Sequence, residues 1–336
     1  MGVARASAFP GSVEVGPYSQ ASLVDGLLFT TGQIPARDGG LETVPEDFAA
    51  QARATLENLR ALLAANGAEL ADVVKVNAYL TAKEQLDPFN AAYREMFGEV
   101  RPSRTTVCIA ALWGVALEVE AVARPSRLPG AVTPDGVDER FERVELATLG
   151  HTLEEGFLEA GLRRIAGVGK IVGRARTLRL AEPDAIAVNE AIRALEPGDV
   201  LCIDLGEHAA HAPVGAVTQA AVRAQGGRGI LVEGIVTDRQ ALEDGLLPVH
   251  ARGVGARTTK RLGAGAHELD VPVTIGGQTI RPGDLVLADA DGALVLDEAR
   301  MAEAVALLDD ALASDEAEPE LLRRLAAGER VGPLAG

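Results

Sequence analysis

The stretch RPSRTTVCIAALWGVALEVEAVA, residues 101–123, contains two extended segments separated by a short turn. The first segment, residues 105–110, is β-branched and apolar. The second alternates strictly, with apolar residues at every other position: Val115, Leu117, Val119, Ala121 and Ala123. Alternation with a period of two is typical of a strand with one buried face. The stretch therefore predicts two strands, and it places Glu118 and Glu120 together on the other face of the second.

Arg104, whose side chain is permanently charged, lies two residues after Pro102 and directly before the β-branched run of the first strand. An arginine near Glu118 could hold the carboxylate of a small acid while the glutamate handles a proton. The same residues could instead form an ion pair on a half-exposed sheet face, which would contribute little. The residue types alone leave both interpretations open.

Length, composition and charge restrict the class of protein. A chain of 336 residues predicts about two domains. Hydrophobic residues make up 47% of the chain and aromatic residues only 3%, so we expect cores built mainly from Ala, Val and Leu. The net charge of −17 argues against nucleic-acid and anionic-membrane partners, because both require clustered Lys and Arg.

The cysteines and the N-terminus indicate a cellular compartment. Cys108 and Cys202 have no metal-binding spacing, which suits a reducing compartment without a disulfide framework. The N-terminus lacks a basic region followed by an apolar run, and no apolar run reaches the roughly 18 residues that span a bilayer. We therefore expect a cytoplasmic protein.

Residues 1–126 form the first predicted domain. Strands are predicted at 21–24, 27–31 and 73–80, in addition to the two described above. One helix is predicted from the first turn at Pro45 to a stop at Asn66, and another is capped by Asp87 with Pro88 at its first position. Two helices among five or six strands predict an α+β layer.

Residues 127–137 are rich in Pro and Gly and are predicted to be a linker. In residues 138–336 we expect helices to alternate with strands, which favours a parallel or mixed α/β sheet. The helices are predicted at 153–162, 185–194 and 217–225, and a C-terminal helical tail begins at Asp297. The strands are predicted at 171–180, 200–204 and 229–236.

The first domain resembles the Rid family, the YjgF-type reactive-intermediate deaminases. The resemblance covers residues 5–125 and rests on the order and spacing of six motifs: GPYSQA (16–21), LLFTTGQIP (27–35), VVKVNAYL (73–80), FNAAYREMFG (89–98), RPSRTTV (101–107) and LEVEAVA (117–123). It implies a chorismate-mutase-like α+β fold, a trimer, and a site between subunits. It implies no metal or organic cofactor for this domain.

The resemblance also implies roles for particular residues. Arg104 matches the arginine that grips the substrate carboxylate, and Glu118 matches the acidic residue that positions water or protonates the substrate. Three further residues match positions that line the pocket: Tyr18, Thr31 and Asn90. Thr106 stands where many members have Cys. We expect an enzyme, an imine or enamine deaminase that hydrolyses the C=N bond of a small 2-imino or 2-oxo acid derivative, with Arg104 and Glu118 facing the same cavity.

The second domain resembles the RraA-like family, which includes 4-hydroxy-4-methyl-2-oxoglutarate aldolase and members named as regulators of an RNA-degrading enzyme. The resemblance covers residues 145–298 and rests on five segments: IVGRARTLRL (171–180), EPGDVLCID (196–204), GGRGILVEGIVTD (226–238), LPVHARG (247–253) and IRPGDLVLADADGALVL (280–296). It implies an α/β fold of the αββα type, again in trimers. We therefore expect the fusion to form a homotrimer or a multiple of trimers.

The aldolase signature of that family is incomplete in this chain. Its final metal-binding Asp corresponds to Asp238, but Thr237 replaces the Arg, and Ala216 replaces the first Asp. Losing the guanidinium removes the main stabiliser of a developing enolate. We therefore expect standard metal-dependent aldolase activity to be lost, with weak Mg²⁺ binding through Asp238 left open because Mg²⁺ needs few protein ligands.

Other interpretations of the second domain remain open. His208 and His211 follow a strand end and could act as an acid–base pair or bind a metal, or they could be solvated loop residues. The domain could run a non-standard lyase, hydrolase or isomerase step on a 2-oxo or 2-imino acid in a specialised pathway. It could also be a non-catalytic scaffold or protein-binding module.

Overall fold

The computed structural model describes residues 4–5, 12, 16–24, 26–37, 40–126, 133–260 and 267–329. The chain divides into two compact units. The first comprises Met1–Ala131 together with Gly167–Gly169 and Gln240–Leu246, and the second comprises Val132–Ala166, Lys170–Arg239 and Leu247–Gly336. The two-domain architecture expected from the sequence is therefore present.

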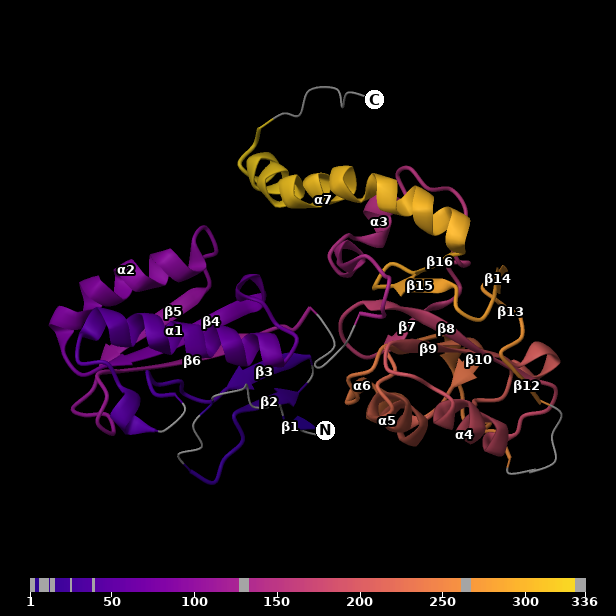
Figure 1. Ribbon diagram of the computed structural model, residues 1–336, viewed down its shortest axis with the longest axis horizontal. Helices are drawn as coiled ribbons and strands as arrows, with labels where there is room; N and C mark the ends of the chain where they lie inside the picture. Colours follow the sequence, from indigo (N-terminus) through magenta and orange to yellow (C-terminus); the bar gives the residue numbers. More distant parts are fainter. Residues whose placement is uncertain are drawn as a thin grey trace. The chain divides into compact units, whose positions relative to one another are not determined.

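The first unit is an α+β layer built on a six-stranded sheet (Figure 1). The strands lie in the order β1-β2-β3-β6-β4-β5, with only β4 and β5 parallel. Its elements, in chain order, are β1 (Ala4–Arg5), β2 (Ala21–Val24), β3 (Leu27–Thr30), η1 (Leu41–Thr43), α1 (Phe48–Ala65), η2 (Leu70–Asp72), β4 (Val73–Leu80), η3 (Lys83–Gln85), α2 (Leu86–Phe97), β5 (Ser103–Cys108) and β6 (Leu117–Ala123).

Strand β6 has the one-sided burial that its alternation predicts. Leu117, Val119, Ala121 and Ala123 are buried, whereas Glu118 and Glu120 are only half-buried. Helices α1 and α2 pack against each other, and α1 packs on β6 (Figure 1). The apolar face of the sheet is therefore the one under the helices, and the carboxylates point away from it.

Both predicted helices of this unit exist, but their starts differ from the prediction. Helix α1 begins at Phe48, three residues after the predicted start at Pro45. The side chain of Asp47 accepts a hydrogen bond from Ala50 N and so caps the helix at this point. Helix α2 begins at Leu86, so Asp87 lies inside the first turn. The helix starts earlier than predicted because the 3₁₀ turn η3 comes directly before it and continues into it. Gln85 Oε1 accepts hydrogen bonds from Thr81 N and Ala82 N, which hold this turn in place.

The second unit is built on a mixed eight-stranded sheet with the path β16-β15-β8-β9-β10-β11-β7, and β12 pairs with β8. The elements from residue 133 onward are η4 (Glu139–Glu142), α3 (Leu146–Leu149), β7 (Arg163–Ala166), β8 (Ile171–Leu180), α4 (Ala185–Arg193), β9 (Asp199–Asp204), η5 (Gly206–His208), α5 (Ala216–Ala224), β10 (Gly229–Val236), α6 (Arg239–Glu243), β11 (Val249–Val254), β12 (His267–Leu269), β13 (Val273–Ile275), β14 (Gln278–Ile280), β15 (Leu285–Ala288), β16 (Ala293–Leu296) and α7 (Glu298–Ala326).

The centre of this sheet is parallel, since β8, β9, β10 and β11 run in the same direction. Helices α4 and α5 lie on one side of the strands, and α3 and α7 lie on the other (Figure 1). This layering is the α/β architecture that the alternation of helices and strands predicts.

The predicted helix at 153–162 is wrong. Gly156 has a φ of +90°, which a right-handed helix does not allow, and its carbonyl accepts a hydrogen bond from Val295 N. Leu158 N donates to Ala293 O, so the segment runs beside β16. Its leucines are buried, and they belong to the two apolar clusters that contain the side chains of β16.

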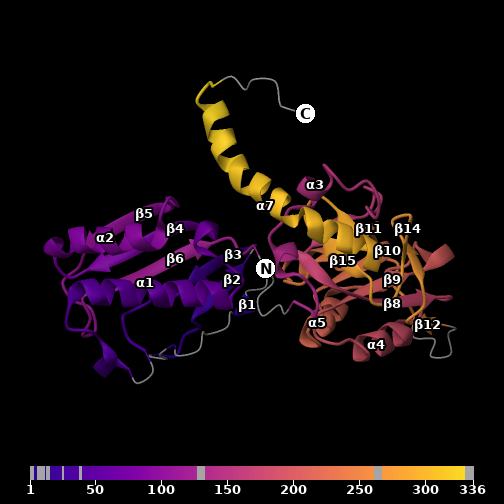
Figure 2. The ribbon, with the colours of Figure 1, turned by 45° about the horizontal axis from the view of Figure 1, so that its top comes forward.

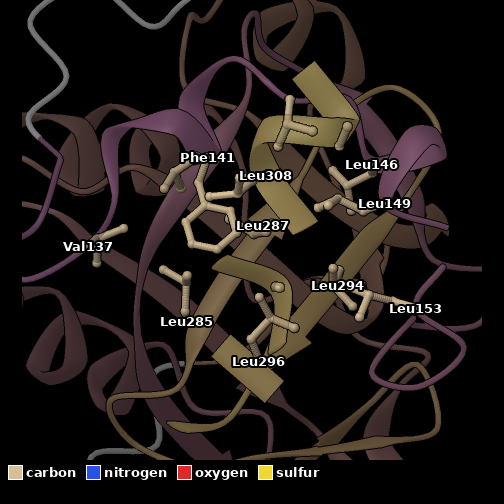
Figure 3. Packing of buried hydrophobic residues seen from close by; sticks show 14 of the residues in the cluster. Val137, Phe141, Leu146, Leu149, Leu153, Leu285, Leu287, Leu294, Leu296 and Leu308 are labelled. Atoms are coloured by element: carbon tan, nitrogen blue, oxygen red, sulfur yellow. The ribbon is translucent and has the colours of Figure 1, made fainter. Parts of the chain in front are cut away.

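A large apolar cluster fills the space between the sheet and helices α3 and α7. Phe141, Leu287 and Leu308 meet there with the side chains of β15 and β16 (Figure 3). Val137, the last residue of the predicted linker, is 7% exposed and belongs to this cluster. Residues 127–132 of that linker lie outside the described residues.

Two buried polar side chains of this unit have hydrogen-bond partners. The guanidinium of Arg228, 2% exposed, donates to both carboxylate oxygens of Glu142 at 2.8 Å. His250 is fully buried, and its Nε2 lies 2.9 Å from the carbonyl oxygen of Asp289. Burial lowers the pKa of His250 to about 4, so this imidazole stays neutral in the folded protein.

Helix α7 is packed over only its first half. Its buried residues end at Leu312, and residues 316–320 and 322–326 are exposed. The outer half extends beyond the strands of the second unit (Figure 2). Although α7 is long, no helix within the described residues is both long and apolar enough to cross a bilayer.

Candidate functional site

A cavity of about 570 Å³ lies in the first unit, beside the end of β3 and the start of β6. Three residues expected at the site line it: Tyr18, Thr31 and Glu118. The turn after β3 contributes Gly32 and Gln33. The apolar part of the lining includes Leu41 of η1 and Trp113 of the turn between β5 and β6. The cavity therefore brings together three of the five residues expected in this domain.

Glu118 is the carboxyl group that lines this cavity. Its carboxyl group is half-buried, and burial raises its pKa, with a further contribution from the negative charge of Glu120. Gly32 lies so close that a side chain there would collide with the carboxylate. Glu118 is therefore a carboxyl group that exchanges its proton nearer to neutral pH than an exposed glutamate does.

Glu120 has a different environment, although it is only two residues away on the same face. Its Oε1 accepts hydrogen bonds from Asn77 Nδ2 and from the hydroxyl of Tyr79, both at 3.0 Å. Burial, together with this hydrogen bond and the charge of Glu120, raises the pKa of Tyr79. Glu120 is held by neighbours on β4, whereas the Glu118 carboxylate faces the cavity.

Arg104 and Asn90 meet away from this cavity. The guanidinium donates from Nη2 to Asn90 Oδ1 at 2.5 Å. Its Cζ atom lies 5.1 Å from the ring centre of Phe89 and 4.5 Å from that of Tyr93, so two of the aromatic rings of α2 flank the cation. These contacts fix the direction of the Arg104 side chain toward α2.

The strand register places Arg104 and Glu118 on opposite faces of the sheet. Arg104 pairs with Val76, which is fully buried beneath the helices, whereas Glu118 pairs with Tyr79 on the other face. Residues paired in register share a face, and successive residues alternate. The expectation that both side chains face one cavity is therefore wrong within a single chain.

Two polar atoms near Arg104 have no hydrogen-bond partner among the described residues. The hydroxyl of Tyr93 and Oγ1 of Thr106 are both buried and unpaired there. Burial raises the pKa of Tyr93 to about 12, and the charge of Arg104 opposes that rise. The family resemblance assigns no role to Tyr93, although its position three residues after Asn90 puts both on one helix face.

In the second unit, Asp238 lies at the start of helix α5. Its Oδ2 accepts a hydrogen bond from Ala216 N at 3.3 Å, where the N-cap residue Gly215 has no side chain to do so. Thr237 Oγ1 lies 3.4 Å from Asp238 Oδ1. Asp238 has a φ of +57°, a strained conformation for a residue with a side chain. The carboxylate thus caps a helix from a neighbouring loop.

His208 and His211 lie one turn apart in η5 and the loop after it. Their ring centres are 5.9 Å apart at an interplanar angle of 69°. His211 Nδ1 is buried and has no hydrogen-bond partner among the residues that the structure describes. No hydrogen bond or ion pair joins either histidine to Asp238 within the described residues, so of the four expected candidates only Thr237 and Asp238 are brought together.

Asp238 is the residue of the aldolase signature that this chain retains, without the signature's other two residues. Within the described residues, no three His, Cys, Asp or Glu side chains are grouped so that they could hold a metal ion. Asp238 already satisfies a helix amide, and Thr237 offers a neutral hydroxyl where the signature has a guanidinium. The expected partners of the carboxylate in metal or pyruvyl binding are therefore missing.

The two domains match two different families. The model for endoribonuclease L-PSP matches residues 11–124, and the model for aldolase/RraA matches residues 137–295. A RutC family protein from Pyrococcus horikoshii is 42% identical over 110 residues, which are 32% of this chain and 87% of that protein. The chain therefore belongs to the RutC family, also called the Rid or YjgF family, and it carries an RraA-like domain fused to that unit.

Other relatives divide between the two domains. A protein provisionally named reactive intermediate deaminase TdcF, from Escherichia coli, is 36% identical over 118 residues, covering 34% of this chain and 89% of that protein. A protein provisionally named 4-hydroxy-4-methyl-2-oxoglutarate aldolase, from Halalkalibacterium halodurans, is 35% identical over 127 residues, or 38% of this chain. The chain covers only 60% of the length of that aldolase relative.

Solved structures are similar to each domain separately. The RNA-processing inhibitor RraA from Thermus thermophilis is 28% identical, with 46% of this chain and 93% of that chain covered and a TM-score of 0.41. Escherichia coli TdcF with bound serine is 35% identical, with 36% of this chain and 94% of that chain covered and a TM-score of 0.32.

Proposed function

We propose that the first domain hydrolyses a small 2-imino or enamino acid to the corresponding 2-oxo acid and ammonia. The observation that supports this most directly is a half-buried Glu118 carboxyl group with a raised pKa, facing a cavity large enough for a small molecule. The relatives provisionally named reactive intermediate deaminases support the same reaction class.

The chemistry suits a carboxyl group in this position. Water adds to the carbon of the C=N bond, and its proton passes to the nitrogen. The C–N bond then breaks, ammonia leaves, and a C=O bond remains. Glu118 would hold the attacking water by accepting one of its hydrogens and would return the proton to the departing nitrogen. A carboxyl group whose pKa is raised toward neutral can play both parts.

The substrate carboxylate requires a cation, and we propose that Arg104 of a second copy supplies it. A guanidinium binds a carboxylate through two parallel charge-assisted hydrogen bonds. Within one chain Arg104 and Glu118 lie on opposite faces of the sheet, so they can meet one substrate only across an interface between copies. The trimer expected from the sequence would provide such an interface.

Hydrolysis can be tested on the full chain with a 2-imino acid generated in place by an amino-acid oxidase in the presence of catalase. We expect Glu118→Gln and Arg104→Ala each to lower the acceleration over spontaneous hydrolysis by about 100-fold or more, because each removes one preorganised charged group. Arg101→Ala is the matched control, since Arg101 is an exposed arginine that pairs with exposed Glu99 and donates to the nearby backbone carbonyls of Gly98 and Val100. Wild-type hydrolysis no faster than the background would overturn the proposal.

The location of the site can be tested by mixing the two inactive variants. If Arg104 and Glu118 act from different copies, refolding equal amounts of Arg104→Ala and Glu118→Gln chains together rebuilds intact sites at random. Symmetric assembly then predicts about a quarter of wild-type activity. No recovery in mixed assemblies would contradict the shared site, as would a monomeric mass by light scattering.

For the second domain we propose that standard metal-dependent aldolase activity has been lost. The use of the Asp238 carboxylate as a helix cap supports this, and it favours the scaffold interpretation over a non-standard lyase, hydrolase or isomerase step. C–C cleavage of pyruvyl compounds, assayed with and without Mg²⁺, separates these interpretations. Cleavage that requires Mg²⁺ and is lost in Asp238→Asn would overturn the proposal.

A further inference from the structure

The indole ring of Trp113 is exposed to solvent beside the cavity. Trp113, the single tryptophan of the chain, is 89% exposed and lies in the turn between β5 and β6. It lines the same cavity as Glu118, together with Leu41, which is 46% exposed. A large exposed aromatic side chain next to a cavity is a common feature of binding surfaces, because burial on binding recovers its apolar area.

The turn that carries Trp113 is fixed by hydrogen bonds rather than loosely tethered. Gly114 adopts a φ of +82°, and its N–H donates to Leu112 O at 2.7 Å. Two residues later, Ala116 N donates to Oε1 of the buried Gln51 at 3.0 Å. The backbone on the C-terminal side of the indole is thus anchored to α1, and the ring is held at the cavity without being buried.

The cavity lining is divided in chemical character. Tyr18, Thr31 and Glu118 supply hydroxyl and carboxyl groups, whereas Leu41 and Trp113 supply apolar surface. The turn at Gly114 lies beside Leu41, since a Cβ added to Gly114 would be 3.9 Å from Leu41 Cδ1. A three-carbon imino acid offers only a methyl group to cover that apolar surface.

We infer that the substrate is a 2-imino acid with an aromatic side chain, which stacks on Trp113 and contacts Leu41 while its imine carbon lies at Glu118. This inference rests on the proposed hydrolysis at Glu118 and specifies its substrate class. An offset-stacked aromatic pair contributes beyond simple burial of area, and the indole is the largest such partner available. Trp113 is thus a specificity-determining residue.

The kinetic test compares imino acids made in place from phenylalanine and from alanine, using the full chain. We expect Trp113→Ala to lower kcat/KM for the phenylalanine-derived imine about tenfold, the size of one stacking contact plus lost contact area, and to change the alanine-derived imine less than about twofold. Trp113→Phe should retain most of the activity on the aromatic imine. An equal loss on both substrates would overturn the inference while leaving the hydrolysis proposal intact.

A binding test does not depend on catalysis. Because Trp113 is the single tryptophan, its fluorescence reports on this position alone. Phenylpyruvate, corrected for its own absorbance with free tryptophan amide, should quench the emission with a Kd at least about tenfold lower than that of pyruvate. Equal affinity for the two acids would overturn the inference. A fall in the mass of the Trp113→Ala assembly would also overturn it, because the indole would then belong to a contact between copies.

Discussion

The carboxylate of Glu118 occupies the space that a side chain at position 32 would need. A Cβ atom added to Gly32 would lie 1.8 Å from Glu118 Oε1, 2.6 Å from its Cδ and 2.8 Å from its Cγ. Three atoms of the glutamate would have to move, so a different residue at position 32 would turn the carboxylate out of its present position. Gly32 therefore determines where this carboxyl group points.

The first prediction concerns Gly32→Ala. Displacing a reacting group by about 1 Å can cost on the order of 100-fold in rate, so we expect kcat/KM for imine hydrolysis to fall by about that factor. The unfolding temperature should change little, because the flexible end of Glu118 can move. Gly292→Ala is the control, since a Cβ there meets nothing within 4 Å. Full activity in Gly32→Ala would show that the position of the Glu118 carboxylate is unimportant.

The second prediction concerns the pH dependence of hydrolysis. The pKa of Glu118 is raised first by burial and second by the charge of Glu120. Glu120→Gln removes that negative charge, which favours the ionised form of Glu118 and lowers its pKa. The acidic limb of the kcat/KM profile should therefore move to lower pH, by up to about one unit. Glu120→Asp keeps the charge and should leave the limb in place; a shift to higher pH in Glu120→Gln would contradict the assignment.

The third prediction concerns the buried ion pair of the second unit. Glu142→Ala leaves the buried Arg228 guanidinium without its carboxylate, and such a change typically costs about 3–5 kcal/mol of folding free energy. Glu316→Ala breaks the exposed pair with Arg143 and should cost less than about 1 kcal/mol. Denaturant unfolding monitored by circular dichroism compares the two. Equal losses would mean that burial of Arg228 does not determine the cost.

The fourth prediction concerns stability in acid. The pKa of His250 is about 4 in the folded chain and 6.5 in an exposed histidine, so the unfolded chain binds the extra proton between these values. Stability is then lost as the pH falls from 6.5 toward 4, by about 2 kcal/mol between pH 7 and pH 5. In His250→Gln this loss should shrink, measured as the difference in unfolding free energy at the two pH values. An unchanged pH dependence in that variant would assign the acid sensitivity to other groups.

The elements that the sequence predicts well are those with one buried face. Strand β6 alternates because the helices cover only one side of the sheet, and β9 and β10 appear as apolar runs because both of their faces are covered. Residues 153–162 look helical from their leucines alone. What excludes the helix is the positive φ of Gly156 together with the backbone pairing of this segment with β16, a partner nearly 140 residues away in the chain.

The candidate site was predictable by residue type but not by arrangement. The motifs single out Tyr18, Thr31 and Glu118, which the fold gathers at one cavity. The position of Arg104 relative to Glu118 depends on how β5 and β6 pair with the strand between them, and that register is a long-range property. The exposure of Trp113 could likewise not be predicted from the sequence, because the residues next to it do not distinguish a buried indole from an exposed one.

The separation of Arg104 and Glu118 by the thickness of a sheet also has a consequence for concentration. An activity that depends on both side chains belongs to the assembly and not to the chain, so it is subject to mass action. Specific activity would then stay constant while the copies remain together and would collapse once the enzyme is diluted below the dissociation constant of their contact. The concentration of the protein in the cell would then determine whether the reaction is catalysed.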